Sequence, residues 1–452
     1  SKCTAGVPPA RGRLAESEGK GGRDARGTLC LVHLLTCTRF IPWKSLDAAR
    51  TCRMMLCVKN RPAGRRHFLE SAALGAAGLV MGGPRTVQAT SSRALKIEEP
   101  FPGAVLNHRQ GKAADKGLAI QVSGKAPAGE RVVVCGTEAQ RQGGKFTAEV
   151  VLRDRETDIT AVSQGASGRL EDRVRVVWDR NSFPRYRFSL DDNSFFLRDI
   201  FQKNYASLFD CFYLALLRDL HRKYGVKFTV NIYFTTADGF DISQFPDRYK
   251  GEWRDCADWL KLAFHAYANE PARPYQDAPP EKLLADLDLV AEQIQRFAGS
   301  RSYAPPTVIH WGMTRHEALK PLRKHGVRVL SGYFCKSGAH YDVNYRFNNV
   351  ISEYLSRHDA WKDFESGLVF SRVDLVCNTT PLERIAATLE PLAQDPNQAE
   401  IMDLFTHEQY FWPFYEHYLP DHAQRLDTAI RWVTEHGYKP VFYHEGFLGA
   451  PA

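Results

Sequence analysis

From Arg185 onward, the sequence alternates short apolar runs with longer amphipathic segments, and this alternation constrains the fold more than any other feature. The apolar runs have the length of buried strands, whereas the segments between them repeat apolar residues every three to four positions, as helices do. Strands and helices in alternation predict a parallel sheet covered by helices. Because several such units follow one another, we expect an α/β domain over residues 183–450, a (β/α) barrel of seven to eight strands.

The pattern also assigns the individual elements of this barrel. The expected strands are Tyr186–Leu190, Lys227–Phe234, Leu260–Phe264, Thr307–His310, Arg328–Tyr333, Leu368–Val376, Ile401–Phe405 and Pro440–Tyr443. The clearest amphipathic helices are Pro280–Phe297, Glu317–His325 and His422–His436. In such barrels the functional groups follow the carboxyl ends of the strands, so the residues after each run are the ones to inspect.

A different pattern precedes the barrel, because residues 117–178 alternate apolar and polar side chains in short runs separated by turn residues. This period of two is typical of antiparallel strands and predicts a small all-β sandwich over residues 100–180. The expected strands are Leu118–Val122, Arg131–Cys135, Phe146–Leu152, Ile159–Val162 and Val174–Val177. With its hairpin at residues 144–150, the segment resembles the immunoglobulin-like modules appended to bacterial carbohydrate-active enzymes. A spacer role is favoured over ligand binding.

The N-terminal part carries a secretion signal. Arg65 and Arg66 precede His67, Phe68 and Leu69, and a soft apolar run at 71–81 ends before a small-residue cleavage pattern at 87–89. We interpret residues 54–89 as a twin-arginine signal peptide and residues 1–53 as upstream or disordered sequence. The apolar run is too short to span a bilayer. We therefore expect the twin-arginine machinery to export the protein to the periplasm or the cell exterior, with no stable membrane span after cleavage.

The basic balance of the whole chain belongs to this N-terminal part. Residues 1–53 hold ten Lys and Arg against four Asp and Glu, and residues 54–89 hold five against one. The remainder has 45 basic and 47 acidic residues, a net charge of −2. A nearly neutral chain has no basic surface of the kind that binds nucleic acid, so we exclude nucleic acid as a partner.

The expected strands end in polar residues with unusual regularity. The residues concerned are Asp191, Asp192, Asn193, His265, His310, His407, Glu408, His444 and Glu445. A single histidine in such a place is more often structural, but their recurrence at one barrel mouth favours a site. Imidazoles and carboxylates converging on one point are what a divalent metal such as zinc requires. The sequence therefore predicts a metal cofactor.

The adjacent aspartates Asp191 and Asp192 suit metal-assisted hydrolysis. One carboxylate binds the metal, while its neighbour accepts a proton from the attacking water. The alternative is that Asp191, Asp192 and Asn193 only form a turn and a helix cap.

These motifs resemble those of the polysaccharide deacetylase (NodB-homology) family, within the glycoside hydrolase/deacetylase barrel superfamily. The segment 188–193 is similar to the family's Thr-Phe-Asp-Asp-Gly motif, and 264–269 occupies the place of its His-x-x-x-His motif. The segment 310–312 resembles the third motif, and 404–407 resembles the late strand that ends in histidine. The resemblance covers roughly residues 185–450, through order and spacing more than identity.

The resemblance implies roles for individual residues. It makes Asp191 the general base, Asp192 and His265 metal ligands, and His407 the late catalytic acid. Two positions depart from the family. Asn269 stands where the second metal histidine is expected, and an amide oxygen is a poorer transition-metal ligand than imidazole. His310 stands where the family usually has an arginine-containing motif. We expect Asp192, His265 and His310 to hold the metal, with Asn269 orienting water or substrate.

Aromatic residues near the expected mouth suit stacking against sugar rings. Tyr267, Trp311 and Trp412 are predicted to bind substrate, and Tyr233 and Tyr410 belong to the same group. The alternative for each is packing within long loops.

Three functions remain open at this stage. The first is a metal-dependent hydrolase that removes an acyl group from carbohydrate. The second is a glycoside hydrolase that uses Asp192 with a second carboxylate, Glu445 or Glu270, and for this reason Glu445 joins the catalytic candidates. The third is a carbohydrate-binding barrel without catalysis. The sequence leaves open the sugar, the acyl group and the oligomeric state.

Overall fold

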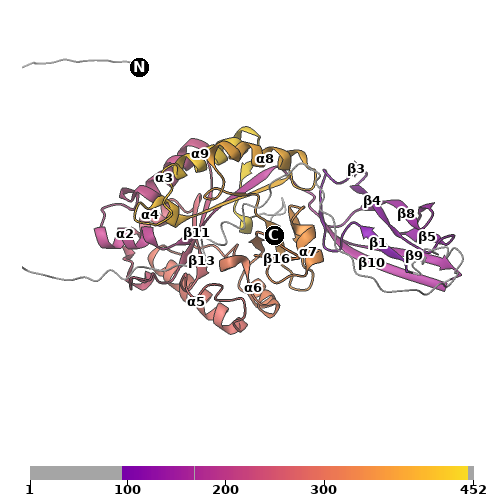
Figure 1. Ribbon diagram of the computed structural model, residues 1–452, viewed down its shortest axis with the longest axis horizontal. Coiled ribbons are helices and arrows are strands. Elements are labelled where there is room, and N and C mark those ends of the chain that lie inside the picture. The colour runs from indigo at the N-terminus through magenta and orange to yellow at the C-terminus, as the bar shows by residue number, and fades with distance from the viewer. Residues whose placement is uncertain (1–93, 167, 446–452) are drawn as a thin grey trace, which may run out of the picture. The chain divides into compact units, whose positions relative to one another are not determined.

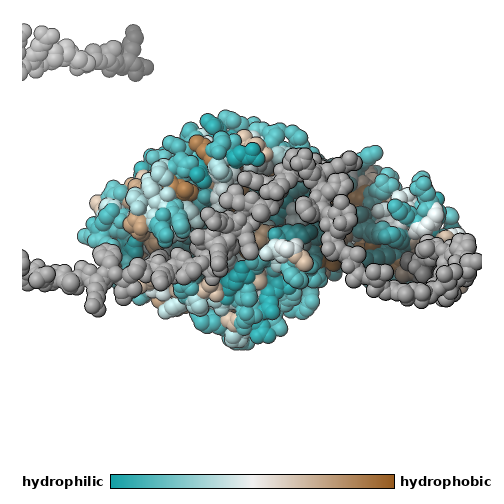
Figure 2. All heavy atoms as spheres, viewed as in Figure 1, coloured by the Kyte–Doolittle hydropathy of each residue, from teal (hydrophilic) through white to brown (hydrophobic). Residues whose placement is uncertain are grey.

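The computed structural model describes residues 94–166 and 168–445 (Figure 1). The predicted upstream segment and twin-arginine signal lie outside the described residues. Among the helices within the described ranges, none is both long and apolar enough to cross a membrane. The visible face in Figure 2 is largely hydrophilic wherever the residues are coloured. On this face the exposed sides of the helices are therefore mostly polar, as amphipathic packing requires.

Two five-stranded β-sheets form the N-terminal part of the described chain. One has the order β1-β4-β8-β7 with β3 beside β4, and the other has the order β2-β10-β9-β5-β6. The strands are β1 Lys96–Glu99, β2 Val105–Leu106, β3 Lys112–Ala114, β4 Gly117–Lys125, β5 Arg131–Val134, β6 Thr137–Glu138, β7 Gln140–Gln142, β8 Lys145–Leu152, β9 Glu156–Gly165 and β10 Gly168–Trp178.

Side chains of both sheets share one apolar cluster. Ile120 and Val122 of β4 and Val132 of β5 are buried in it, while alternate residues of β4 face outward. This is the period of two that a half-buried strand shows. The predicted β-sheets are confirmed in their place, and the immunoglobulin-like character of the module stays a prediction.

A parallel sheet forms the centre of the C-terminal part. Its order is β13-β12-β11-β20-β19, and β21 also pairs with β11. The strands are β11 Arg185–Asn193, β12 Phe228–Tyr233, β13 Leu260–Ala266, β19 Leu375–Val376, β20 Ile401–His407 and β21 Lys439–Pro440. Every residue of β12 is buried. Parallel strands that are covered on both faces have nearly continuous apolar sequences. The sequence predicted these strands for that reason.

A smaller, three-stranded sheet follows the parallel sheet. Its order is β14-β18-β17, with β14 Val329–Gly332 parallel to β18 Val369–Arg372 and β17 Ala360–Lys362 antiparallel to β18. The hairpin of β15 Cys335–Ser337 and β16 His340–Asp342 follows β14.

The two sheets are joined by two bridging segments. The predicted strand Thr307–His310 is wrong, because this stretch is irregular and ends in a short 3-10 turn at His310–Gly312. Backbone hydrogen bonds in and near this stretch still link it to the strands on either side. The amide of Leu262 in β13 donates to Ser302 O at 2.8 Å, and the amide of Ser331 in β14 donates to Thr307 O at 2.7 Å. The expected strand Leu368–Val376 is broken into β18, which pairs with β14, and β19, which pairs with β20. Backbone hydrogen bonds thus run around a ring, which makes the domain barrel-like.

Helices cover the outside of this ring. They are α2 Phe195–Lys203, α3 Phe212–Tyr224, α4 Lys250–Asp255, α5 Pro280–Phe297, α6 Leu319–Lys324, α7 Asn349–Leu355, α8 Ile385–Gln394 and α9 His422–Glu435. Figure 1 shows α3, α8 and α9 on one side of β11 and β13, and α5 and α6 on the other. The helices predicted from the sequence are present, and α5 has the predicted bounds.

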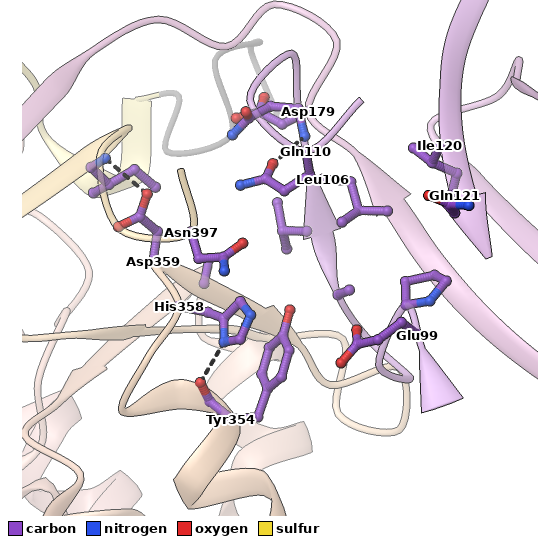
Figure 3. Close-up of a pocket in the computed structure, with 16 residues that line it drawn as sticks. Glu99, Leu106, Gln110, Ile120, Gln121, Asp179, Tyr354, His358, Asp359 and Asn397 are labelled. Atoms are coloured by element: carbon purple, nitrogen blue, oxygen red, sulfur yellow. Dashed lines mark hydrogen bonds between the residues drawn. The ribbon is translucent and has the colours of Figure 1, made fainter. Parts of the chain in front are cut away.

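The β-module and the barrel-like part touch through specific bonds. Nε1 of Trp361 donates to Pro102 O at 2.7 Å, and the guanidinium of Arg109 pairs with the buried Glu400. A cavity of about 190 Å³ lies beside these contacts (Figure 3), and residues such as Leu106 and Tyr354 line it. None of the predicted site residues lines this cavity. The predicted site residues therefore lie elsewhere in the fold.

Candidate metal centre

The end of β11 places two consecutive aspartates on one side of the sheet. Asn231 and Tyr233 lie on the same face of β12, because they are two residues apart in a strand. Asp191 bonds to Asn231 at 2.6 Å, and Asp192 accepts a hydrogen bond from Tyr233. A regular strand would turn these two aspartates to opposite faces. Asp192 instead has a φ of +60°, and the pairing of β11 with β12 shifts register there. The local left-handed turn therefore presents both carboxylates to the same space.

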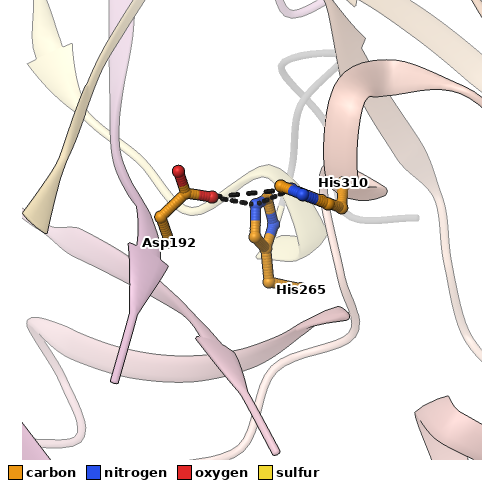
Figure 4. Close-up of side chains that lie close together, drawn as sticks. All are labelled: Asp192, His265 and His310. Carbon is orange, nitrogen blue, oxygen red and sulfur yellow. Dashed lines mark hydrogen bonds and ion pairs between the residues drawn. The ribbon is translucent and has the colours of Figure 1, made fainter. Parts of the chain in front are cut away.

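Three side chains from three separate segments converge in this space (Figure 4). Nε2 of His265, at the end of β13, lies 3.0 Å from Asp192 Oδ1. Nδ1 of His310 lies 3.0 Å from His265 Nε2 and 3.5 Å from Asp192 Oδ1. We call Asp192, His265 and His310 the candidate metal centre. It is the group of metal-ligating side chains that the described residues bring together within 4.8 Å.

The triangle of these three atoms has the size that a metal requires. Zinc lies about 2.1 Å from nitrogen and oxygen ligands, so two ligands in a tetrahedral site are about 3.4 Å apart. The observed edges of 3.0, 3.0 and 3.5 Å are close to that spacing. Two imidazoles and one carboxylate are also a donor set that leaves further coordination positions open. The residues present therefore fit a divalent metal ion.

The protonation states at the centre suit a cation as well. Burial on its own would raise the pKa of Asp192, but the imidazoles of His407, His265 and His310 hold that pKa well below its usual range. Burial, reinforced by His265, lowers the pKa of His310 to about 3. A carboxylate and a neutral imidazole are the forms that bind a metal. Nδ1 of His265 is buried and has no hydrogen-bond partner among the described residues, so only Nε2 orients this ring.

Both oxygens of Asp192 are held by neighbours. Oδ1 accepts from Tyr233 and faces His265, while Oδ2 accepts from Nε2 of Gln409 at 3.0 Å. Sequence reasoning missed Gln409, which directly follows the predicted His407 and Glu408. Tyr233 was expected to stack on sugar, but its ring is only 3% exposed and its hydroxyl points at Asp192. The signal for Tyr233 was a hydroxyl at the carboxyl end of a strand, two residues after the polar Asn231.

Asp191 lies next to the centre with one oxygen occupied. Its Oδ1 accepts from Ser189 Oγ at 2.7 Å and from Asn231 Nδ2 at 2.6 Å. Within residues 94–166 and 168–445, Oδ2 makes no hydrogen bond, and it is not sealed from solvent. Asp191 is thus oriented by one oxygen and can accept a proton on the other.

His407, at the end of β20, approaches the centre at Oδ2 of Asp192. Nδ1 lies 3.0 Å from Asn378 Oδ1, and Nε2 lies 3.9 Å from Asp192 Oδ2. Because the carbonyl of Asn378 accepts, the proton of a neutral His407 stays on Nδ1 and Nε2 faces the site. The side chain is 26% exposed, so a substrate group can reach it. Asn378 was not anticipated from the sequence.

Glu408 fixes the loop beside the centre. Its carboxylate accepts the amides of Ser194, Phe195 and Phe196, at 2.6 to 2.8 Å, and the indole N–H of Trp412 at 3.1 Å. These amides are the unpaired donors of the first turn of α2. Burial raises the pKa of Glu408 to about 7, although the N–H groups favour its charged form. Glu408 therefore joins the end of β20 to the segment that carries Asp192.

The predicted substrate residues fall into two groups. Tyr267 is 40% exposed and stacks on Phe234 at 5.1 Å, and Trp311 is half-buried below the guanidinium of Arg273. Both rings reach the surface near strand ends. Trp412 is 5% exposed and its N–H is used by Glu408, so the prediction that it stacks on substrate is corrected.

Asn269 lies behind Tyr233 in this arrangement. Its Oδ1 is 3.1 Å from the Tyr233 hydroxyl, and among the described residues no hydrogen bond joins its side chain to His265 or His310. The backbone of Asn269 is a hydrogen-bond partner of the His310 ring. Asn269 is therefore close to the centre without entering its donor triangle.

Glu445 lies at the other end of the strands, which corrects its prediction as a catalytic group. β21 pairs with the first residues of β11, through Pro440 and Tyr186. The chain ends its described part shortly afterwards, and Glu445 bonds to Lys227, directly before β12, at 3.2 Å. The prediction placed Glu445 correctly beside a strand but at the wrong end of it.

The fold and the centre together define an α/β protein with a barrel-like parallel sheet and a candidate metal site at its carboxyl edge. No protein-family model matches the chain, and no curated protein matches it. Family membership therefore stays a prediction.

Solved structures give distant likenesses. The 4-alpha-glucanotransferase from Thermococcus litoralis matches 59% of this chain with 15% identity and a TM-score of 0.37. The chain spans 39% of the length of that enzyme. The Bc1960 peptidoglycan N-acetylglucosamine deacetylase matches 57% of this chain and 85% of its own, with 12% identity and a TM-score of 0.28. Both likenesses are distant, with TM-scores under 0.5.

Proposed function

We propose that this protein is a metal-dependent hydrolase that removes an acyl group from carbohydrate. The observation that carries the proposal is the compact triangle of Asp192, His265 and His310, which has the donor set and the edge lengths of a three-ligand metal site. Catalytic metal sites keep a position open for water or substrate, and three protein ligands leave one.

The residues around the triangle supply the remaining chemistry. When bound, the metal polarises an acyl carbonyl and lowers the pKa of water. Asp191 accepts the proton of the attacking water on Oδ2, because Oδ1 is already held by Ser189 and Asn231. His407, in its imidazolium form, then donates the Nε2 proton to the leaving amine or alcohol and is left as the neutral ring with its proton on Nδ1, held by Asn378. Asp191 and His407 are paired residues of the neighbouring strands β11 and β20, so the base and the acid lie beside Asp192 at the same edge of the sheet.

A sugar substrate agrees with the surface near the centre. The exposed ring of Tyr267 directly follows β13, and the half-buried ring of Trp311 directly follows His310 in the 3-10 turn. Aromatic rings of this kind pack against the apolar faces of sugars. Export by the twin-arginine route, which Arg65 and Arg66 suggest, is part of the proposal because it would bring the enzyme to envelope or extracellular glycans.

The glycosidase alternative loses one of its two expected carboxylate pairs. Glu445 lies at the amino end of β12, bonded to Lys227, whereas Asp192 lies at the carboxyl end of β11. A retaining glycosidase needs its carboxyl groups about 5 Å apart. We therefore do not propose that activity.

The experiment is metal reconstitution followed by an acyl-release assay. Purified protein is stripped with chelator, loaded separately with zinc and with ferrous iron, and analysed for bound metal. It is then offered acetylated oligosaccharides while released acetate is measured. We expect one zinc ion per chain and acetate release that chelator abolishes.

The controls separate binding from catalysis. Asp192→Asn keeps the side-chain shape and is expected to lose metal and turnover together, whereas Asp427→Asn, a surface carboxylate paired with Lys223, keeps both. No stoichiometric metal after reconstitution would refute the proposal. Retained sugar binding without acetate release would identify a non-catalytic barrel instead.

A further inference from the structure

The hydroxyl of Tyr233, which the proposed chemistry does not use, lies at the centre of a set of polar atoms. It contacts Asp192 Oδ1 and lies 3.1 Å from Asn269 Oδ1. It is also 3.3 Å from Nδ1 and 3.4 Å from Nε2 of His310. The ring itself is buried against His265 and His310, with ring centroids 5.3 Å from each.

Burial decides what this hydroxyl can do. With 3% of the residue exposed, no substrate reaches it, so Tyr233 is not a direct acid or a sugar platform. Its almost equal distances to the two nitrogens of His310 show that it faces the ring between them. The hydroxyl is therefore not aimed at either nitrogen alone as a hydrogen-bond partner. Nδ1 of His310 stays available as a ligand atom of the donor triangle.

A phenol has one proton and can give it to only one of the two oxygens near it. The Asp192 carboxylate is the stronger acceptor because it is charged, so the proton goes to Oδ1. The contact with Asn269 is then favourable when the amide presents its NH₂ group to the phenol oxygen. The two ends of an amide have the same shape, and the network determines which end faces the tyrosine.

We propose that Asn269, Tyr233 and Asp192 form a hydrogen-bond chain that positions the metal-binding oxygen of Asp192. Asn269 donates to the phenol oxygen, and Tyr233 donates to Asp192 Oδ1. Gln409 holds Oδ2 from the other side at 3.0 Å, so the carboxylate is fixed at both oxygens. Tyr233 and Asn269 are positioning residues, since they act through Asp192.

The chain also assigns a role to the position at which this sequence departs from the resemblance. Asn269 stands where a second metal histidine is expected, and the structure places the phenol of Tyr233 between its amide and Asp192. An amide at this position orients a ligand through the tyrosine, whereas an imidazole would compete with the tyrosine for the carboxylate. The inference rests on the proposed metal site and adds to it the means by which that site is kept in shape.

The test measures metal affinity in four proteins: the wild type, Tyr233→Phe, Asn269→Ala and the double variant. Zinc dissociation constants are obtained by competition with a chelator, and the absorption spectrum of each cobalt-loaded protein reports the ligands. Partners that orient metal ligands typically change affinity by about tenfold to a hundredfold. We expect Tyr233→Phe to weaken zinc binding by that factor and to leave the positions of the cobalt bands unchanged.

Asn269→Ala tests the order of the chain. It is expected to weaken zinc binding less than Tyr233→Phe does and to add nothing in the Tyr233→Phe background, because its effect passes through the phenol. The matched control is Tyr438→Phe, another buried tyrosine, whose hydroxyl donates to Ala399 O at 2.9 Å away from the centre. The control is expected to bind zinc as the wild type does.

The outcomes separate this inference from the proposed function. A wild type that binds neither zinc nor cobalt overturns both. A wild type that binds metal, with unchanged affinity in Tyr233→Phe, overturns the hydrogen-bond chain alone. Altered cobalt bands in Tyr233→Phe would show the phenol to be a direct ligand, and an additive effect of Asn269→Ala would show that Asn269 acts independently. Either result would also overturn the chain.

Discussion

Replacing the buried His422 by glutamine is expected to make the protein less sensitive to acid. His422 is the first residue of α9, is 1% exposed, and has Nε2 at 2.8 Å from Thr406 Oγ1. Burial, together with Arg425 and His407, lowers the pKa of His422 from 6.5 to about 3. The folded protein therefore keeps this imidazole neutral at pH values at which the unfolded chain has already bound a proton.

The sign and the size of the effect follow from this difference. Below pH 6.5 the unfolded state binds more protons than the folded state, so the free energy of unfolding decreases as the pH falls. The contribution of His422 is fully present above pH 6.5 and is lost progressively down to its folded pKa. One pH unit corresponds to about 1.4 kcal/mol, so the loss between pH 6.5 and pH 5 is about 2 kcal/mol.

The assay is urea unfolding, followed by tryptophan fluorescence at pH 7.5, 6.5 and 5. The wild type is expected to lose about 2 kcal/mol more than His422→Gln over this range, because glutamine does not titrate. His325→Gln serves as the control, since His325 is an exposed histidine at the end of α6. Parallel pH profiles for the wild type and His422→Gln would refute the reasoning, even if the two proteins differed in stability at every pH.

Three further changes test other parts of the structure. Glu408→Ala removes the acceptor of three α2 amides and one indole N–H, and is expected to lower the free energy of unfolding in urea by about 3 kcal/mol or more; a loss under about 1 kcal/mol would contradict the capping role. His407→Gln is expected to lower kcat for acyl release by about a hundredfold or more while the zinc content stays at one ion per chain; a loss of zinc would instead make His407 a ligand. Arg65→Lys combined with Arg66→Lys is expected to retain the protein in the cytoplasm, as immunoblots of cell fractions would show, whereas normal export would rule out the twin-arginine route.

The sequence predicted the strands that carry the site because their signal is local. The run before Asp191 and the run that contains His265 are long, apolar and bounded by polar residues, and both fold as parallel strands. His310 was also found, although the strand expected to carry it is an irregular segment. Its position depends on single backbone bonds to two neighbouring strands, and no periodicity in the sequence records such bonds.

The errors at the site have a different physical origin. Glu445 was misplaced because the sequence shows that a polar residue follows a strand but not which residues of the neighbouring strand pair with it. Trp412 was assigned the wrong role because its indole N–H bonds to Glu408. Glu408 in turn bonds to amides of α2 that lie more than two hundred positions away in the sequence. Tyr233 was assigned the wrong role, and Gln409 was missed, for the same reason. Each acts through Asp192, and only the folded sheet brings them to it.

The left-handed backbone at Asp192 also limits which substitutions can report on the centre. At a φ of +60°, aspartate and asparagine are tolerated far better than alanine or glutamate, since their short polar side chains bond to the local backbone. An alanine variant would change the turn and the ligand together, and its phenotype would not identify the missing carboxylate. A glutamate would strain the turn while extending the oxygen beyond the triangle. Any set of variants at this site should therefore treat residue 192 as a position where one side chain determines both the backbone conformation and the metal ligand.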